Sequence, residues 1–128
     1  MITTSHPYMK IRVTDDKKIK DIQEAFAHEF PFLKIEFFSK AHPSKGASDR
    51  KLMLVATKSL GECRSRHNDG VITIKQDMTV TEVEETFNKK FGLSAQIFRM
   101  SGKVWLETTV TDGWTLEEQN REGKDLSD

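Results

Sequence analysis

Residues 71–92 read VITIKQDMTVTEVEETFNKKFG, and the fold class follows from this stretch. Apolar and polar residues alternate over Val71–Lys75, which predicts a strand with one buried face. Thr79 and Glu82 have the spacing of a capping box at the start of a helix. Gly92 suits the left-handed residue that ends a helix. The residues at helical spacing that predict its buried stripe are Val80, Val83, Phe87 and Phe91.

A similar pattern lies 61 residues earlier in the chain. The positions that match across the two stretches are Ile11/Ile72, Val13/Ile74, Asp16/Asp77, Ile19/Val80, Ile22/Val83, Glu24/Glu85, Phe26/Phe87 and Phe30/Phe91. Any two β–α–β segments share part of this pattern, because strand and helix periods impose it. The run of matches nevertheless favours a structural repeat over chance.

Further strands are expected around these two units. In the first unit, Pro31 stops the helix, and the aromatic stretch 32–39 and the stretch 51–57 are expected as strands. In the second unit, residues 94–100 and 103–110 are expected as strands around a Ser101-Gly102 turn.

These elements predict an α+β fold in a single domain, residues 1–128. The expected architecture is two βαββ repeats, at residues 9–58 and 71–110, in one largely antiparallel sheet with two helices on one face. A ferredoxin-like sandwich is the nearest topological analogy. Residues 112–128 are expected as a short helix or tail. A helix that starts at Thr115 and ends before Gly123 is preferred over a hairpin at Asp112-Gly113.

Composition excludes several protein classes. The single cysteine excludes a disulfide framework and any zinc site built from several cysteines. The chain has no run of about 20 apolar residues, so no membrane span is expected. The N-terminal stretch lacks the pattern of a secretory signal, and we expect a cytoplasmic protein.

Charge is balanced over the whole chain but not along it. Residues 1–75 carry 14 lysine and arginine residues against 9 acidic ones, whereas residues 76–128 carry 6 against 11. The basic excess is concentrated in residues 40–67, which suggests binding of a nucleic acid or a phosphorylated ligand. The candidate binding residues of that segment are Lys40, Lys45, Arg50, Lys51, Lys58, Arg64, Arg66 and His67.

Catalysis is disfavoured. Cys63 lies among Arg64, Arg66 and His67, a setting that could lower the pKa of a nucleophilic thiol, but a free thiol without a role is the better interpretation of a lone cysteine. No histidine spacing indicates a metal site, and no phosphate-binding or dinucleotide motif is present. We therefore expect no catalytic residues, no metal and no cofactor.

Aromatic residues suggest an interaction surface. Trp105 alternates with apolar neighbours and is a candidate for an open sheet face that two helices would leave uncovered, and Trp114, which follows a glycine, is a candidate to pack over that face as a lid. The preferred function is a non-catalytic interaction module that self-associates as a homo-oligomer or binds a protein partner through that face. Nucleic-acid binding through residues 40–67 is the first alternative, and a cysteine-dependent enzyme is the second.

Overall fold

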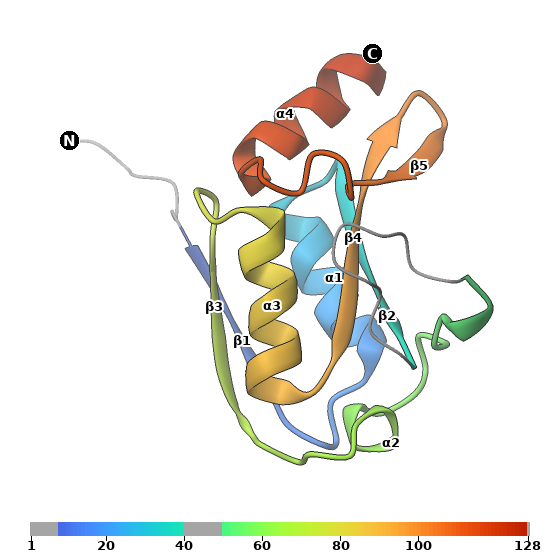
Figure 1. Cartoon of the computed structure of the whole chain (residues 1–128), viewed down its shortest axis with the longest axis vertical. Helices are drawn as coiled ribbons and strands as arrows, with labels where there is room; N and C mark the ends of the chain where they lie inside the picture. Colours follow the sequence, from blue (N-terminus) through green and yellow to red (C-terminus); the bar gives the residue numbers. More distant parts are fainter. Residues whose placement is uncertain (1–7, 40–49, 128) are drawn as a thin grey trace.

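The computed structural model describes residues 8–39 and 50–127 and has an α+β architecture (Figure 1). In chain order its elements are β1 Tyr8–Val13, α1 Ile19–Glu29, β2 Leu33–Phe38, the 3₁₀ turn η1 Arg50–Leu52, α2 Leu60–Cys63, β3 Gly70–Lys75, α3 Val80–Phe91, β4 Ser94–Ser101, β5 Val104–Glu107 and α4 Leu116–Ser127. In the described part of the chain, no helix is long and apolar enough to cross a membrane.

The strands form two antiparallel sheets instead of the single sheet predicted from the sequence. β1 pairs with β3, with Ile11 opposite Ile72. The second sheet has the order β2-β4-β5, with Ile35 opposite Ile97. The prediction of one sheet with both helices on one face is therefore wrong. The β1–β3 and β2–β4 ladders each pair a strand of one chain half with a strand of the other, whereas β4–β5 lies within the second half. The two halves therefore interlock rather than lie side by side.

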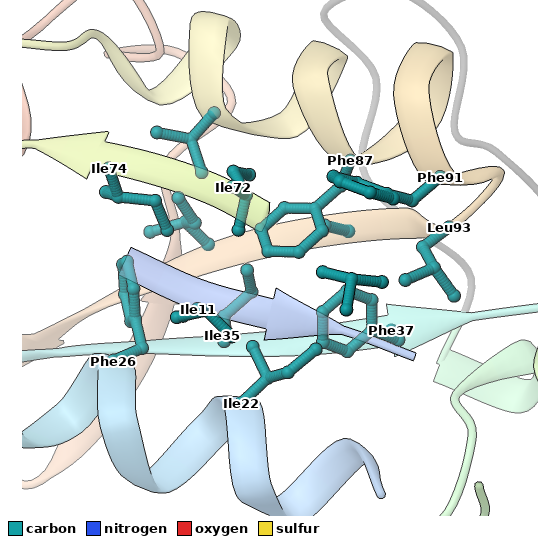
Figure 2. Close-up of a cluster of buried hydrophobic side chains, with 14 of the residues drawn as sticks. Ile11, Ile22, Phe26, Ile35, Phe37, Ile72, Ile74, Phe87, Phe91 and Leu93 are labelled. Carbon is teal, nitrogen blue, oxygen red and sulfur yellow. The ribbon is translucent and has the colours of Figure 1, made fainter. Parts of the chain in front are cut away.

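The core is enclosed by both sheets and by the helices α1 and α3. In Figure 1 the β1–β3 pair and the β2–β4 pair lie on opposite sides of the molecule, and Figure 2 shows α1 and α3 on opposite sides of the labelled core residues, with strands between the two helices. Phe26 and Phe87, at matching positions in the two helices, are both completely buried. Phe37 meets Phe87 edge to face with ring centroids 5.3 Å apart. Both apolar stripes predicted from helical spacing therefore point into this core.

The predicted start and end of α3 are confirmed. The Thr79 hydroxyl accepts the Glu82 N–H at the start of α3, and Gly92 ends the helix with a φ of 69°. α4 begins after Thr115 as predicted, but it continues through Gly123 to Ser127. At Gly123 the helix packs closely against Phe32, just before β2, and Arg99 of β4: a Cβ at Gly123 would lie 2.9 Å from the Cβ of Phe32 and 3.1 Å from the Cγ of Arg99. Asn120 also accepts the N–H of Phe32 at 2.9 Å.

The predicted strand at residues 51–57 is wrong. Only Met53 forms an isolated bridge, to Phe38, after the turn η1. The chain then turns, with the Lys58 N–H donating to Val55, and enters the short helix α2. Ser59 and Glu62 form a capping box there, a signal that sequence analysis missed within the expected loop between the units.

Two helix-start junctions have matching backbone hydrogen bonds. The first junction comprises residues 15–21 and 55–62, and the second comprises residues 76–82 and 111–118. The first junction has the donor–acceptor pairs Ile19→Lys58, Lys20→Ala56, Leu60→Lys17 and Gly61→Asp15. The second has Val80→Trp114, Thr81→Asp112, Leu116→Met78 and Glu117→Gln76, at corresponding places. Each junction joins the start of a long helix to the start of the next helix.

Candidate functional site

Cys63 lies in a structural rather than an activating environment. Its thiol donates to the Ser59 carbonyl at 3.1 Å, the i−4 contact expected within a helical turn. Burial raises the pKa of the Cys63 thiol, Lys58 opposes that shift, and Glu62 adds to it. A raised pKa reduces the thiolate fraction at neutral pH, which weighs against a nucleophilic role.

Arg64 is the centre of a polar cluster that joins the two halves of the chain. Its side chain is fully buried, and its guanidinium donates to Asp15 Oδ1 at 2.8 and 3.1 Å. It also donates to the backbone carbonyls of Asn68, at 2.7 Å, and Phe91, at 3.3 Å, and to Asp69 Oδ1 at 3.1 Å. Five hydrogen bonds on one buried cation indicate a structural function, because a guanidinium has five N–H groups to donate.

Two neighbours of Arg64 are also engaged within the chain. His67 Nδ1 lies 2.8 Å from Asp15 Oδ2, and hydrogen bonds from His67 and then Arg64 lower the pKa of Asp15. Arg66 donates to the carbonyls of Asn88 and Lys89, at 2.7 and 2.9 Å, at the end of α3. A cation at a helix C-terminus is favourable, so Arg66 completes that helix.

The structure describes only part of the remaining predicted binding residues of the basic segment. Lys51 is exposed and Lys58 is half-buried. Lys40 and Lys45 lie outside the described residues, and Arg50 is placed only as the first residue of η1. Among the described members of the segment, the structure brings together Arg64 and His67 around Asp15, and it directs Arg66 to α3.

The two tryptophans lie in different places. Trp105 is half-buried, and Lys34 Nζ lies 5.3 Å from the centroid of its ring and 5.1 Å from that of Phe98. Trp114 is 39% exposed in the second junction, where the guanidinium carbon of Arg99 lies 5.7 Å from its ring. The face of the three-stranded sheet that carries Trp105 is only partly open, because Phe38 and Phe98 on it are buried.

A basic sheet face, which sequence analysis missed, lies on the β1–β3 ribbon. Because paired residues of an antiparallel ribbon share a face, its outward side chains follow from the register and the burial pattern. They are Tyr8, Lys10, Arg12, Val71, Thr73 and Lys75, called the basic face below. It has three cations and no carboxylate, and within the described part of the chain none of these cations forms an ion pair.

The sequence did contain a signal for this face. Tyr8, Lys10 and Arg12 alternate with the inward residues of β1, and the outward set of the β1–β3 ribbon contains no acid. Pairing with β3 adds Lys75 beside Tyr8. That pairing joins residues more than sixty positions apart, so the face becomes visible only once the register is known.

No metal site is indicated, because no group of three or more histidine, cysteine or acidic side chains with the geometry to hold a metal ion occurs within residues 8–39 and 50–127. Comparisons with models of protein families, with curated proteins and with solved structures found no match. Function is therefore inferred from the contacts and charges of this chain alone.

Proposed function

We propose that this chain is a non-catalytic interaction module that binds an acidic segment of a protein partner on the basic face. The observation that carries the proposal is the charge of that face: Lys10, Arg12 and Lys75 are exposed, and no carboxylate lies among the outward residues of the ribbon. Surface cations without internal partners attract a complementary partner and fix its register.

An acidic protein fits this face better than a nucleic acid does. The chain has a formal net charge of zero, whereas nucleic-acid binders are typically strongly basic. Arg64, Arg66 and His67, the arginine and histidine members of the segment that suggested phosphate binding, make contacts inside the chain. Three cations on a two-stranded ribbon suffice for a short acidic peptide, and Tyr8 and Val71 add apolar surface to the same face.

We also infer that the module arose from two copies of one β–α–β unit. The four backbone hydrogen bonds of each junction support this, as do the matched burial of Phe26 and Phe87 and the pairing of Ile11 with Ile72 at the centre of a ribbon. Two copies related in this way have an approximate two-fold axis. Different side chains at matching positions then make the two matching surfaces of the module unlike in charge.

A binding experiment with a fluorescein-labelled oligoglutamate peptide tests the proposed function. We expect the full chain to bind this peptide more tightly than a glycine–serine peptide of equal length, and binding to weaken as salt rises. Replacing Lys10 and Arg12 by glutamine should weaken binding by at least about tenfold, because close charge pairs contribute more than about 1.4 kcal/mol.

The matched control replaces Lys89 and Lys90 by glutamine, which removes the same charge from exposed positions of α3. Equal affinity of this control and the Lys10/Arg12 variant would contradict a specific face. A labelled single-stranded oligonucleotide serves as the competing probe. Tighter binding of the oligonucleotide than of the peptide would indicate that the partner is a nucleic acid and not an acidic protein.

A further inference from the structure

We propose that the acidic partner of the basic face is the second junction of another copy of the same chain, which gives head-to-tail self-association. This inference rests on the proposed function, because it names the occupant of the same basic face. Its support is the charge and the exposed apolar surface of the second junction.

The two segments of the second junction carry charge of one sign, and two arginines, Arg99 and Arg121, lie beside them. The segments, residues 76–82 and 111–118, contain no lysine or arginine. Their five carboxylate residues are Asp77, Glu82, Asp112, Glu117 and Glu118, of which all but the half-buried Asp112 are exposed. Four backbone hydrogen bonds hold the two segments together, so these carboxylates are carried by adjacent segments.

Hydrogen bonds fix the positions of the two capping glutamates on this surface. Glu118 accepts the N–H and the hydroxyl of Thr115, and these bonds lower the pKa of Glu118. The corresponding capping glutamate, Glu82, accepts from Thr79 in the same way. Arg121 approaches Glu117 at 3.8 Å on the exposed side of α4, a surface pair that contributes little.

The first junction does not offer such a surface. Its segments carry four lysines and four carboxylates, and one of the carboxylates, Asp15, is bound to Arg64 and His67. The acidic surplus thus occurs at one of two matching places in the fold. A complementary contact between unlike surfaces is heterologous and joins copies head to tail, whereas matching surfaces would join them across a two-fold axis.

Exposed apolar side chains occur on both surfaces. Val110, just before the second junction, is 94% exposed, and Trp114 within it is partly exposed. On the basic face, Tyr8 and Val71 are each a little over two-fifths exposed. Tryptophan and tyrosine are the side chains that most often dominate binding energy at interfaces, so each surface carries one candidate anchor. Each anchor has a cation of its own chain near its ring, Arg99 at Trp114 and Lys10 at Tyr8.

Within one molecule these two surfaces do not neutralise each other. Among the described residues, Lys10, Arg12 and Lys75 form no ion pair with the carboxylates of the second junction. Lys10 Nζ instead lies 5.8 Å from the ring centroid of Tyr8 on its own strand. Within residues 8–39 and 50–127, the exposed side chains of both surfaces can therefore meet a second copy.

Sedimentation velocity of the full chain and two variants tests the proposal. The first variant replaces Lys10 and Arg12 by glutamine, and the second replaces Asp77 by asparagine and Glu117 by glutamine. We expect the wild-type chain to form species larger than a dimer as concentration rises at about 0.05 M salt, and to dissociate at about 0.5 M salt. Each variant alone should be monomeric, because it retains only one of the two surfaces.

An equimolar mixture of the two variants gives the most direct test of the head-to-tail contact. It should restore a 1:1 dimer and nothing larger, since each partner supplies the one surface that the other has lost. Control variants that neutralise Lys89 and Lys90, or Glu122 and Asp125, should associate like the wild type. A monomeric mixture, or variants that still self-associate, would overturn the head-to-tail contact.

The result also separates this inference from the proposed function. A wild-type chain that stays monomeric at about 0.05 M salt, while its oligoglutamate binding still depends on Lys10 and Arg12, would overturn self-association and keep the acidic-partner proposal. Loss of both properties would overturn both. Unchanged binding of oligoglutamate to the Asp77/Glu117 variant would confirm that its basic face is intact.

Discussion

The two junctions have the same backbone arrangement and different chemistry. Both join a long helix to the next helix through four corresponding hydrogen bonds. The first is held by a buried cation, Arg64, whereas the second is held by a buried amide, Gln119. Gln119 donates to the carbonyl and the hydroxyl of Thr111 at 2.7 and 2.8 Å, and it accepts from Arg99 at 2.9 Å. The shared hydrogen bonds maintain the fold, while the differing side chains set the charge of each surface.

The largest expected effect tests whether the two halves contribute equally to the core. Phe26→Ala and Phe87→Ala should each lower the free energy of unfolding by about 3–5 kcal/mol, because both rings are completely buried in one well-packed core. Urea denaturation measures both changes. Similar values would support equivalent halves. A change below about 1 kcal/mol at either position would contradict the claim that the two halves contribute equally to the core.

Much of this core could be predicted from sequence alone. The stripes ending in Phe30 and Phe91 are local, since helical spacing places their residues on one face whatever surrounds the helix. The division into two sheets could not be predicted, because it depends on strands of one half pairing with those of the other. The predicted strand at residues 51–57 was wrong because the chain forms a 3₁₀ turn at Arg50–Leu52 and turns again at residues 55–58 before α2, which leaves only a short contact with Phe37 and Phe38 between the two turns.

The candidate site was predictable only in part. The sequence identified the basic segment but not where its side chains lie in the fold. Their contacts there decide whether they bind a partner or stabilise the protein. Arg64 lies inside the protein because Asp15, forty-nine residues earlier, supplies a carboxylate there. Lys10 and Lys75 acquire a shared face only through the β1–β3 register. Long-range pairings of this kind have no local sequence signal.

A smaller effect tests whether the buried side chain of Arg64 stabilises the first junction. Arg64→Met should lower the free energy of unfolding by about 1–3 kcal/mol, because the carbonyls of Asn68 and Phe91 lose a buried donor. Arg66→Met is the matched control, since Arg66 is exposed, and it should cost less than about 1 kcal/mol. Thermal and urea denaturation measure both. Equal effects of the two substitutions would show that Arg64 is not the structural centre of the first junction.

The pH dependence of stability should also distinguish the junctions. The pKa of Asp15 in the folded chain lies below its ordinary value of 3.8, so the folded state favours the ionised carboxylate. Its stabilising effect is present above the pKa of the unfolded state and disappears as pH falls through the folded pKa. Asp15→Asn should therefore make stability less dependent on pH in the acid range, measured by urea denaturation at several pH values. Gln76→Asn, the neutral change at the matching place, should leave that dependence unaltered, and an unaltered dependence in Asp15→Asn would contradict the role of this carboxylate.

The smallest effect concerns the hydroxyl caps that both junctions share. Ser59 accepts the N–H of Glu62 at 3.3 Å, and Thr115 accepts that of Glu118 at 3.1 Å. Ser59→Ala and Thr115→Ala should each lower the free energy of unfolding by about 1 kcal/mol, as is usual for the loss of an N-cap. Because α2 has four residues and α4 has twelve, the loss at Ser59 should expose the whole of α2, whereas the loss at Thr115 should fray only the first turn of α4. Hydrogen exchange measures this difference. In Ser59→Ala we expect faster exchange across all of α2, and in Thr115→Ala we expect the later turns of α4 to stay protected. This result would show that the same kind of cap stabilises the whole of a short helix but only the first turn of a long one. Equal exchange changes along both helices would contradict it.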